Sequence, residues 1–210
     1  MKNSNFCFVA VLTLVLTFAS CKKDNNEISK PGLVPLKSGN SWTYKVYRSN
    51  IVVDTIVLKV SDYVSIDGYK GFRLISGDNS FSETFLVDND NDGNYMSLGG
   101  YSDKDTLIAA SMRYKKNALK GDSWDFQEIS YVNNTYFEKV DIQMLCICSD
   151  TAINTSIGNF KCKAYQWSPD NGADVFIDYI SENIGNVKTE HFENNHLFSY
   201  QILLDYNVTK

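Results

Sequence analysis

The sequence has few of the residues that usually mark an enzyme or a nucleic-acid-binding protein. It contains only two histidines, and it lacks nucleophile motifs, paired-glycine phosphate loops and zinc-ligand spacings. Its net charge is −5 and no long basic run occurs, so it lacks the electrostatic footprint of a nucleic-acid partner. Proline is scarce, at three residues, and no window shows clear helical periodicity. These absences argue against an enzyme, a nucleic-acid-binding protein and a helical fold.

No apolar run is long enough to cross a bilayer. The longest, Phe6 to Ala19, has about 14 residues, whereas a spanning helix needs about 20. It follows Lys2 and ends at Ser20-Cys21, which predicts a signal peptide over residues 1–20. Residues 18–21, Phe-Ala-Ser-Cys, resemble the lipobox of bacterial lipoproteins. That resemblance implies cleavage before Cys21 and attachment of lipid to its thiol.

The segment that follows the cysteine is polar and charged. Residues 21–32 offer no apolar period from which a helix or strand could gain burial, so we predict a lipidated cysteine followed by a flexible tether. The expected partner of this part of the chain is a lipid bilayer, reached through acylated Cys21. The expected location is the outer membrane, with the domain facing the periplasm or the cell surface.

The remaining residues have the composition of strands and turns. Thr, Val and Ile recur in short runs separated by Asn, Asp, Gly and Ser, and the chain holds 13 tyrosines and 12 phenylalanines. We predict one all-β domain over residues 33–210. Its antiparallel meanders should form a curved sheet, a half-barrel or a barrel.

A sequence pattern occurs twice. Leu36 to Tyr44 returns as Leu119 to Phe126, and both copies fit G-x-x-W-x-aromatic. Downstream, Ile66 to Leu74 is echoed by Ile157 to Tyr165. The repeat predicts two meanders of five or six strands each, with halves at 33–117 and 118–210. The alternative is chance similarity, because turns favour the same few residues.

Two of these strands carry a family resemblance. Pro35 to Tyr44 fits P-L-K-x-G-x-x-W-x-Y, and Gly158 to Tyr165 fits G-x-F-x-C-x-x-Y. With these motifs the chain resembles uncharacterised outer-membrane or surface lipoproteins of the Bacteroidota type. The resemblance implies a curved, half-barrel-like β-sheet of the kind seen in periplasmic lipid-handling lipoproteins, and no established activity.

An acidic turn is the first candidate site. Asp88, Asp90 and Asp92 have the alternate spacing with which carboxylate oxygens converge on calcium, and Gly93 permits a tight bend. Gly99 stands where an EF-hand needs a glutamate, so an EF-hand is excluded. We favour the other interpretation, an ordinary Asp/Asn/Gly hairpin turn, over a calcium site.

Cysteines and histidines supply the other candidates. Cys146, Cys148 and Cys162 remain after export, and they suggest one disulfide or, equally, small buried hydrophobes. His191 and His196 flank a predicted turn and could approach on one hairpin face, but no third metal ligand is evident, so we favour a solvated hairpin. The sequence predicts no cofactor, and calcium at the acidic turn is the less favoured alternative.

The leading function predicted by the sequence is a non-enzymatic binding or assembly module of the cell envelope. Its partner would be an apolar ligand held on a concave sheet, or an envelope protein docked on the surface. The abundance of tyrosine makes a glycan-binding surface protein an alternative, since aromatic faces stack on sugar rings. A hydrolase with a site assembled only in space is a less favoured alternative.

Overall fold

A computed structural model describes residues 32–76, 84–101, 105–132, 136–169 and 172–209. The predicted signal peptide, Cys21 and the tether as far as residue 31 lie outside the described residues. Gly32, the last residue assigned to the tether, is buried. Every regular element in the described ranges is a β-strand. The strands are β1 Ser41–Arg48, β2 Ile51–Ile66, β3 Tyr69–Ser76, β4 Thr84–Asn89, β5 Tyr95–Tyr101, β6 Thr106–Tyr114, β7 Ser123–Val132, β8 Tyr136–Thr155, β9 Gly158–Trp167, β10 Asp174–Ser181, β11 Gly185–Glu193 and β12 His196–Asn207.

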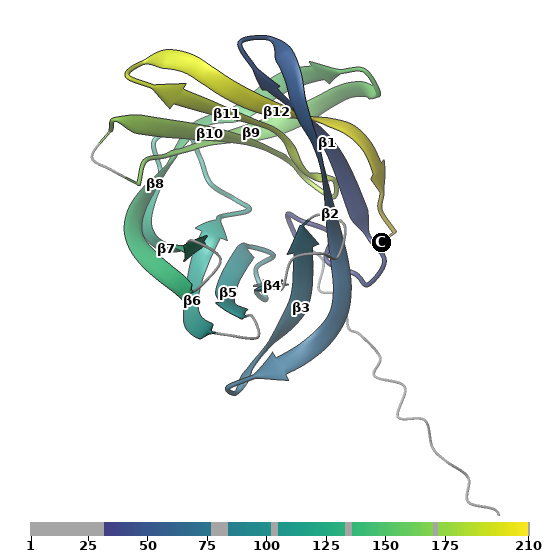
Figure 1. The fold of residues 1–210 in the computed structure, drawn as a ribbon, viewed down its shortest axis with the longest axis vertical. Helices are drawn as coiled ribbons and strands as arrows, with labels where there is room; N and C mark the ends of the chain where they lie inside the picture. The colour runs from purple at the N-terminus through teal and green to yellow at the C-terminus, as the bar shows by residue number, and fades with distance from the viewer. Residues whose placement is uncertain (1–31, 77–83, 102–104, 133–135, 170–171, 210) are drawn as a thin grey trace, which may run out of the picture.

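The strands form one antiparallel sheet whose order explains its shape. That order is β6-β5-β4-β3-β2-β1-β12-β11-β10-β9-β8-β7, so two six-stranded meanders are joined where β1 pairs with β12. The sheet curls until its two edges, β6 and β7, lie next to each other (Figure 1). The predicted all-β antiparallel fold is therefore confirmed, as a twelve-stranded sheet nearly closed into a barrel.

The longest strand of each meander bends. β2 has 16 residues and β8 has 20, and each is the second strand of its meander. The pairing register of β2 with β3 shifts between Val60 and Tyr63, and that of β8 with β9 shifts around Cys148. An extra residue on one strand of a pair bends it and increases its twist. These irregularities let the two long strands curve around the barrel, as Figure 1 shows.

Side chains hold the seam between β6 and β7. The hydroxyl of Ser111 donates to the carbonyl oxygen of Gln127 at 3.2 Å and accepts from the backbone amide of Gln127 at 3.1 Å. Trp124 Nε1 donates to the carbonyl oxygen of Met112 at 3.0 Å. These bonds satisfy backbone groups of the two edge strands. Without them, those groups would be free to form hydrogen bonds with water or with another chain.

The two copies of the G-x-x-W pattern form similar turns. Gly39 N donates to Val60 O at 2.9 Å, and Gly121 N donates to Cys146 O at 2.8 Å. Both glycines have positive φ, 90° and 96°, which disfavours any residue with a Cβ. In each turn the same partner residue also donates a hydrogen bond to the carbonyl oxygen of the residue after the glycine. Val60 N donates to Asn40 O, and Cys146 N donates to Asp122 O. The duplication and its half boundaries stay predictions.

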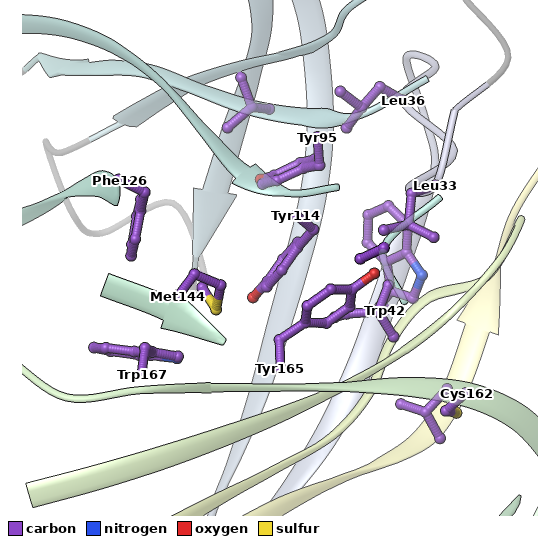
Figure 2. Close-up of a cluster of buried hydrophobic side chains, with 14 of the residues drawn as sticks. Leu33, Leu36, Trp42, Tyr95, Tyr114, Phe126, Met144, Cys162, Tyr165 and Trp167 are labelled. Atoms are coloured by element: carbon purple, nitrogen blue, oxygen red, sulfur yellow. The ribbon is translucent and has the colours of Figure 1, made fainter. Parts of the chain in front are cut away.

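The core fills one part of the barrel interior with aromatic rings. Figure 2 shows Tyr95, Tyr114 and Tyr165 close together among Leu33, Met144 and other apolar side chains. The rings of Tyr95 and Tyr114 are 5.6 Å apart and stacked, and those of Tyr114 and Tyr165 are 5.3 Å apart. Such pairs contribute roughly 0.5–1.5 kcal/mol each beyond the burial of their area.

Candidate functional site: a cavity inside the barrel

A cavity of about 410 Å³ lies inside the barrel, beside this core. Strands of both meanders line it, together with Val34 and Leu36 from the segment that precedes β1. This segment is fixed by hydrogen bonds: Leu33 N donates to Gly93 O at 2.9 Å, and Asn89 Nδ2 donates to Val34 O at 2.8 Å. Small-molecule sites typically have volumes of about 300–1,000 Å³. The cavity is thus large enough for one small ligand.

One wall of the cavity is a row of stacked rings on neighbouring strands. Phe176 on β10 pairs with Trp167 on β9 and with His191 on β11. Its ring centroid lies 4.3 Å from each of theirs, with interplanar angles of 14° and 9°. The row arises because residues directly opposite in paired strands point to the same face. It offers a continuous aromatic surface to a ligand.

Next to this row of rings, two residues away on β10 and β11, lies a row of polar side chains. Asp178, two residues after Phe176 on β10, is only 2% exposed. Its Oδ2 accepts hydrogen bonds from Tyr114 OH and Trp167 Nε1, both at 2.8 Å, and its Oδ1 accepts from Thr189 Oγ1 at 2.7 Å. A buried carboxylate needs such donors to offset the loss of water. Asp178 therefore fixes side chains from three other strands.

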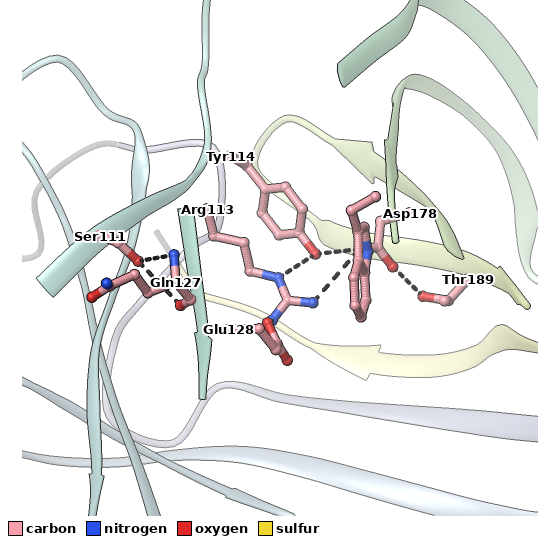
Figure 3. Close-up of polar contacts among 8 residues, drawn as sticks. Ser111, Arg113, Tyr114, Gln127, Glu128, Asp178 and Thr189 are labelled. Atoms are coloured by element: carbon pink, nitrogen blue, oxygen red, sulfur yellow. Dashed lines mark hydrogen bonds and ion pairs between the residues drawn. The ribbon is translucent and has the colours of Figure 1, made fainter. Parts of the chain in front are cut away.

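Arg113 on β6 reaches toward the same carboxylate, as Figure 3 shows. Its Nη1 lies 2.6 Å from Glu128 Oε2 across the β6–β7 seam, and its Nη2 lies 3.7 Å from Asp178 Oδ2. Its guanidinium also lies over the rings of Phe126 and Trp167, 5.4 and 5.3 Å from their centroids. Burial by itself would lower the pKa of Arg113, but Glu128 and its other neighbours raise it well above the ordinary value. Arg113 and Asp178 thus form a charged floor of the cavity, and their charges are paired with each other and with Glu128.

The tyrosines around this floor remain protonated. Burial raises the pKa of Tyr95 to about 12. Burial also raises the pKa of Tyr44 and that of Tyr114 well above the usual value near 10. Their hydroxyl groups consequently act as hydrogen-bond donors at neutral pH, and Tyr44 OH donates to the carbonyl oxygen of Asn186 at 2.9 Å.

A second, smaller space adjoins the first. It measures about 270 Å³, and it shares Leu58, Leu74, Tyr95 and Arg113 with the larger cavity. Glu128 and Ile129 on β7 line its far side. Arg113 therefore borders both spaces.

The acidic turn, which was considered as a possible calcium site, is held by hydrogen bonds of its own. Asp90 Oδ1 accepts from the backbone amides of Asp92 and Asn94, both at 2.9 Å, and its Oδ2 accepts from Asn94 Nδ2 at 2.8 Å. Asp88 is buried, at 8% exposure. Within the described ranges, these three aspartates do not form a group of three mutually close metal-ligand atoms. The contacts are those of an Asp/Asn hairpin turn, and calcium binding there stays a prediction.

The predicted disulfide is not formed in the structure. Cys146, Cys148 and Cys162 are free thiols. The β8–β9 hairpin turns between Thr155 and Gly158, and its register places Cys162 opposite Thr151 rather than opposite either other cysteine. Cys146 and Cys162 are buried, at 0% and 2% exposure, which agrees with the alternative of small core residues. Burial raises the pKa of Cys162 to about 12.

The two histidines have different environments. His191 lines the cavity, whereas His196 is exposed next to the Asn194-Asn195 turn. Both turn residues have positive φ, 49° and 65°, as a tight two-residue hairpin requires. His191 Nε2 lies 2.8 Å from Asp174 Oδ1. Asp174 was not singled out by sequence, because the register of β10 and β11, not sequence proximity, brings it there.

Sequence reasoning also missed the cavity floor. A signal for Asp178 was present, since a lone acid interrupts the apolar residues Phe176-Ile177 and Tyr179-Ile180. With strand alternation, such an acid shares the face of Phe176 and Ile180 and must find donors inside. No comparable signal identified Arg113 or Glu128, because they lie on the two edge strands and meet only when the sheet curls.

These features define a class: an all-β protein whose single antiparallel sheet curls into a nearly closed barrel around an internal cavity. No protein-family model matches the chain, and no curated protein matches it in sequence. Among the described residues, no helix is long and apolar enough to span a membrane.

Two solved structures share the fold. One, from Parabacteroides distasonis, is described as a "putative lipoprotein"; it is 16% identical, with a TM-score of 0.53 over 84% of this chain and 99% of that chain. The other, from Bacteroides fragilis, is described as a "putative exported protein with YmcC-like fold"; it is 14% identical, with a TM-score of 0.52 over 83% of this chain and 98% of that chain. The chain thus resembles, in structure, exported proteins and lipoproteins of unknown function. At these identities the likeness shows the fold alone.

Proposed function

We propose that this chain is a membrane-anchored envelope lipoprotein that binds one small, mostly apolar molecule in the barrel cavity, without catalysis. The observation that carries the proposal is the cavity itself, about 410 Å³ of space inside a folded barrel. Burial of apolar surface contributes roughly 25 cal/mol per Å², so a ligand that covers the ring wall gains affinity without ion pairs.

The lining favours a ligand with an apolar body and a polar group. The body would lie on the ring row of Trp167, Phe176 and His191. Ser199 and Gln201 on β12 line the same cavity and supply a hydroxyl and an amide for a polar group. A few such groups in an apolar pocket fix the orientation of a ligand.

The paired state of the floor supports binding rather than catalysis. A general base needs a carboxylate that can take a proton from a substrate. Asp178 instead accepts hydrogen bonds from Tyr114, Trp167 and Thr189, and Arg113 lies 3.7 Å away. The hydrolase alternative is therefore less favoured. The glycan alternative is also less favoured, because the stacked rings line the cavity inside the barrel and do not form a flat outer surface.

The anchoring part of the proposal rests on Cys21. Its lipobox-like context implies two or three acyl chains, and each buried methylene contributes about 0.8 kcal/mol, which gives durable attachment. The fold shared with an exported protein and a lipoprotein agrees with this address. Docking to an envelope protein remains the runner-up function.

Native mass spectrometry of the chain purified from membranes tests the proposal. We expect a one-to-one adduct that denaturation releases as a small molecule separate from the acyl chains on Cys21. Ser199→Trp should reduce the adduct, because Ser199 lines the cavity and the larger side chain fills it. Ser65→Trp is the matched control, since Ser65 is exposed and outside the cavity lining. An adduct that is equally abundant in both variants would contradict the proposal.

A further inference from the structure

Three side chains with metal-binding atoms converge near the cavity, outside its paired floor. Asp174, His191 and Glu193 each offer one ligand atom, and these atoms all lie within 4.8 Å of one another. They come from the start of β10 and the end of β11. They form the one such group of three His, Cys, Asp or Glu residues within the described parts of the chain.

The sheet register brings the three together. Asp174 pairs directly with Glu193, so both side chains project from the same face. His191 precedes Glu193 by two residues, which places it on that face as well. The tight turn that follows is held by the bond from Asn194 N to Ala173 O, at 3.0 Å. The cluster is therefore built on paired strands instead of a loop.

The imidazole is held in position by its neighbours. Its ring stacks on Phe176 at 4.3 Å and meets the ring of Phe198 edge-on at 5.4 Å. This packing directs Nε2 toward Asp174 Oδ1, 2.8 Å away. A metal-binding histidine gains from such fixed ring orientation, because less freedom is lost when the ion binds.

The charges of the cluster would attract a cation. Two carboxylates directly opposite each other on neighbouring strands repel each other. All three residues are partly accessible, so an ion can enter from solvent. One imidazole with two carboxylates is a nitrogen and oxygen donor set that suits zinc and similar transition metals, and three protein ligands leave a coordination position open.

We propose that Asp174, His191 and Glu193 bind one divalent transition metal ion, with zinc as the best match to this donor set. Ligands in a tetrahedral zinc site lie roughly 3.3 Å apart, given bonds of about 2.0–2.1 Å. The three ligand atoms, all within 4.8 Å of one another, are close to that spacing. Because His191 also lines the cavity, the ion lies at the cavity wall. The proposal does not depend on a ligand in the cavity.

Zinc chloride is the probe for the test, with zinc content measured by elemental analysis after equilibrium dialysis. The chain should retain one more zinc equivalent than His191→Gln or Glu193→Gln, and the affinity of the site should fall at least about tenfold in each variant. Cys146, Cys148 and Cys162 are present in every sample. The difference in zinc content therefore reports the proposed site and not the thiols.

His196→Gln is the matched control, because His196 lies on the same hairpin but outside the group of three. It should keep the zinc equivalent. Zinc should also raise the melting temperature of the unmodified chain and of His196→Gln, but not that of His191→Gln, since an ion that binds only the folded state stabilises it.

Two results would overturn the proposal. One is unchanged zinc content in both His191→Gln and Glu193→Gln, which includes the case in which the unmodified chain retains no zinc. The other is an equal loss in His196→Gln, which would assign the ion to a surface histidine pair. Glu193→Gln alters a partly exposed side chain at the end of β11, so it keeps the test informative if His191→Gln fails to fold.

Discussion

The hydroxyl of Tyr114 donates a hydrogen bond to Asp178 Oδ2 at 2.8 Å, and this bond connects the last strand of the first meander to a strand of the second (Figure 3). The two residues are separated by 64 positions in the chain. Arg113, adjacent to Tyr114, extends the connection to Glu128 on β7. The residues of the cavity floor therefore also connect the two meanders across the barrel. The stability of the barrel should depend on the Asp178 carboxylate.

Asp178→Asn should lower the free energy of unfolding by about 3 kcal/mol. The substitution removes a buried negative charge beside Arg113 and places an amide among groups that need an acceptor. Urea denaturation followed by tryptophan fluorescence measures the change. Asp125→Asn, at an exposed position on β7, is the control and should stay within about 0.5 kcal/mol of the unmodified chain. A loss below about 1 kcal/mol for Asp178→Asn would show that the carboxylate does not brace the barrel.

Ser111→Ala should loosen the seam between the two edge strands. It removes both hydrogen bonds to the backbone of Gln127, at a cost of about 1–2 kcal/mol. Hydrogen exchange should speed up at the Gln127 amide, while amides in β11, within the paired sheet, should keep their rates. Unchanged exchange at Gln127 would mean that the hydroxyl does not hold the seam.

Gly39→Ala and Gly121→Ala test whether the two turns are equivalent. Neither added methyl group meets another atom within 4 Å, so the cost arises from positive φ alone. Each should destabilise the protein by about 1–2 kcal/mol. Thermal unfolding of the two variants should give similar shifts. A clear loss at one turn and none at the other would count against equivalent meanders.

Alkaline pH should destabilise the protein through its buried tyrosines. Burial raises the folded-state pKa of Tyr95 to about 12, whereas an unfolded tyrosine has a pKa of about 10. Because the folded pKa is the higher one, its contribution is complete below about pH 10 and is lost as the pH rises toward 12. Urea midpoints measured between these pH values should fall, and Tyr95→Phe should fall less steeply. An equal slope in Tyr95→Phe would contradict the assignment.

Much of the fold was predictable from local pattern. Trp42 and Tyr44 alternate after a glycine turn, and both are buried in β1 as expected, at 3% and 1% exposure. Turn residues marked the hairpins, because left-handed conformations favour Asn, Asp and Gly. The closure of the sheet into a barrel was harder to predict from the sequence. The pairing of β1 with β12 joins strands from opposite ends of the chain, and no local signal specifies which edges meet.

The candidate sites show the same limit. His191 was noted in the sequence, but its neighbours Asp174 and Phe176 reach it only through the β10–β11 register. The cysteines were noted as well, but the register of the β8–β9 hairpin places none of them opposite another, and a shift in register changes every cross-strand neighbour. A site that is built across strands depends on register, which the residues of one strand do not encode.

The most direct test of cavity binding is a titration with the apolar fluorescent probe N-phenyl-1-naphthylamine, carried out on the chain and on Ser199→Trp. We predict saturable binding of one probe by the chain and by the control Ser65→Trp. We expect an affinity at least about tenfold weaker in Ser199→Trp, because the new ring occupies the space between β12 and the wall of Trp167 and Phe176. Equal probe affinity in Ser199→Trp and the unmodified chain would contradict the account.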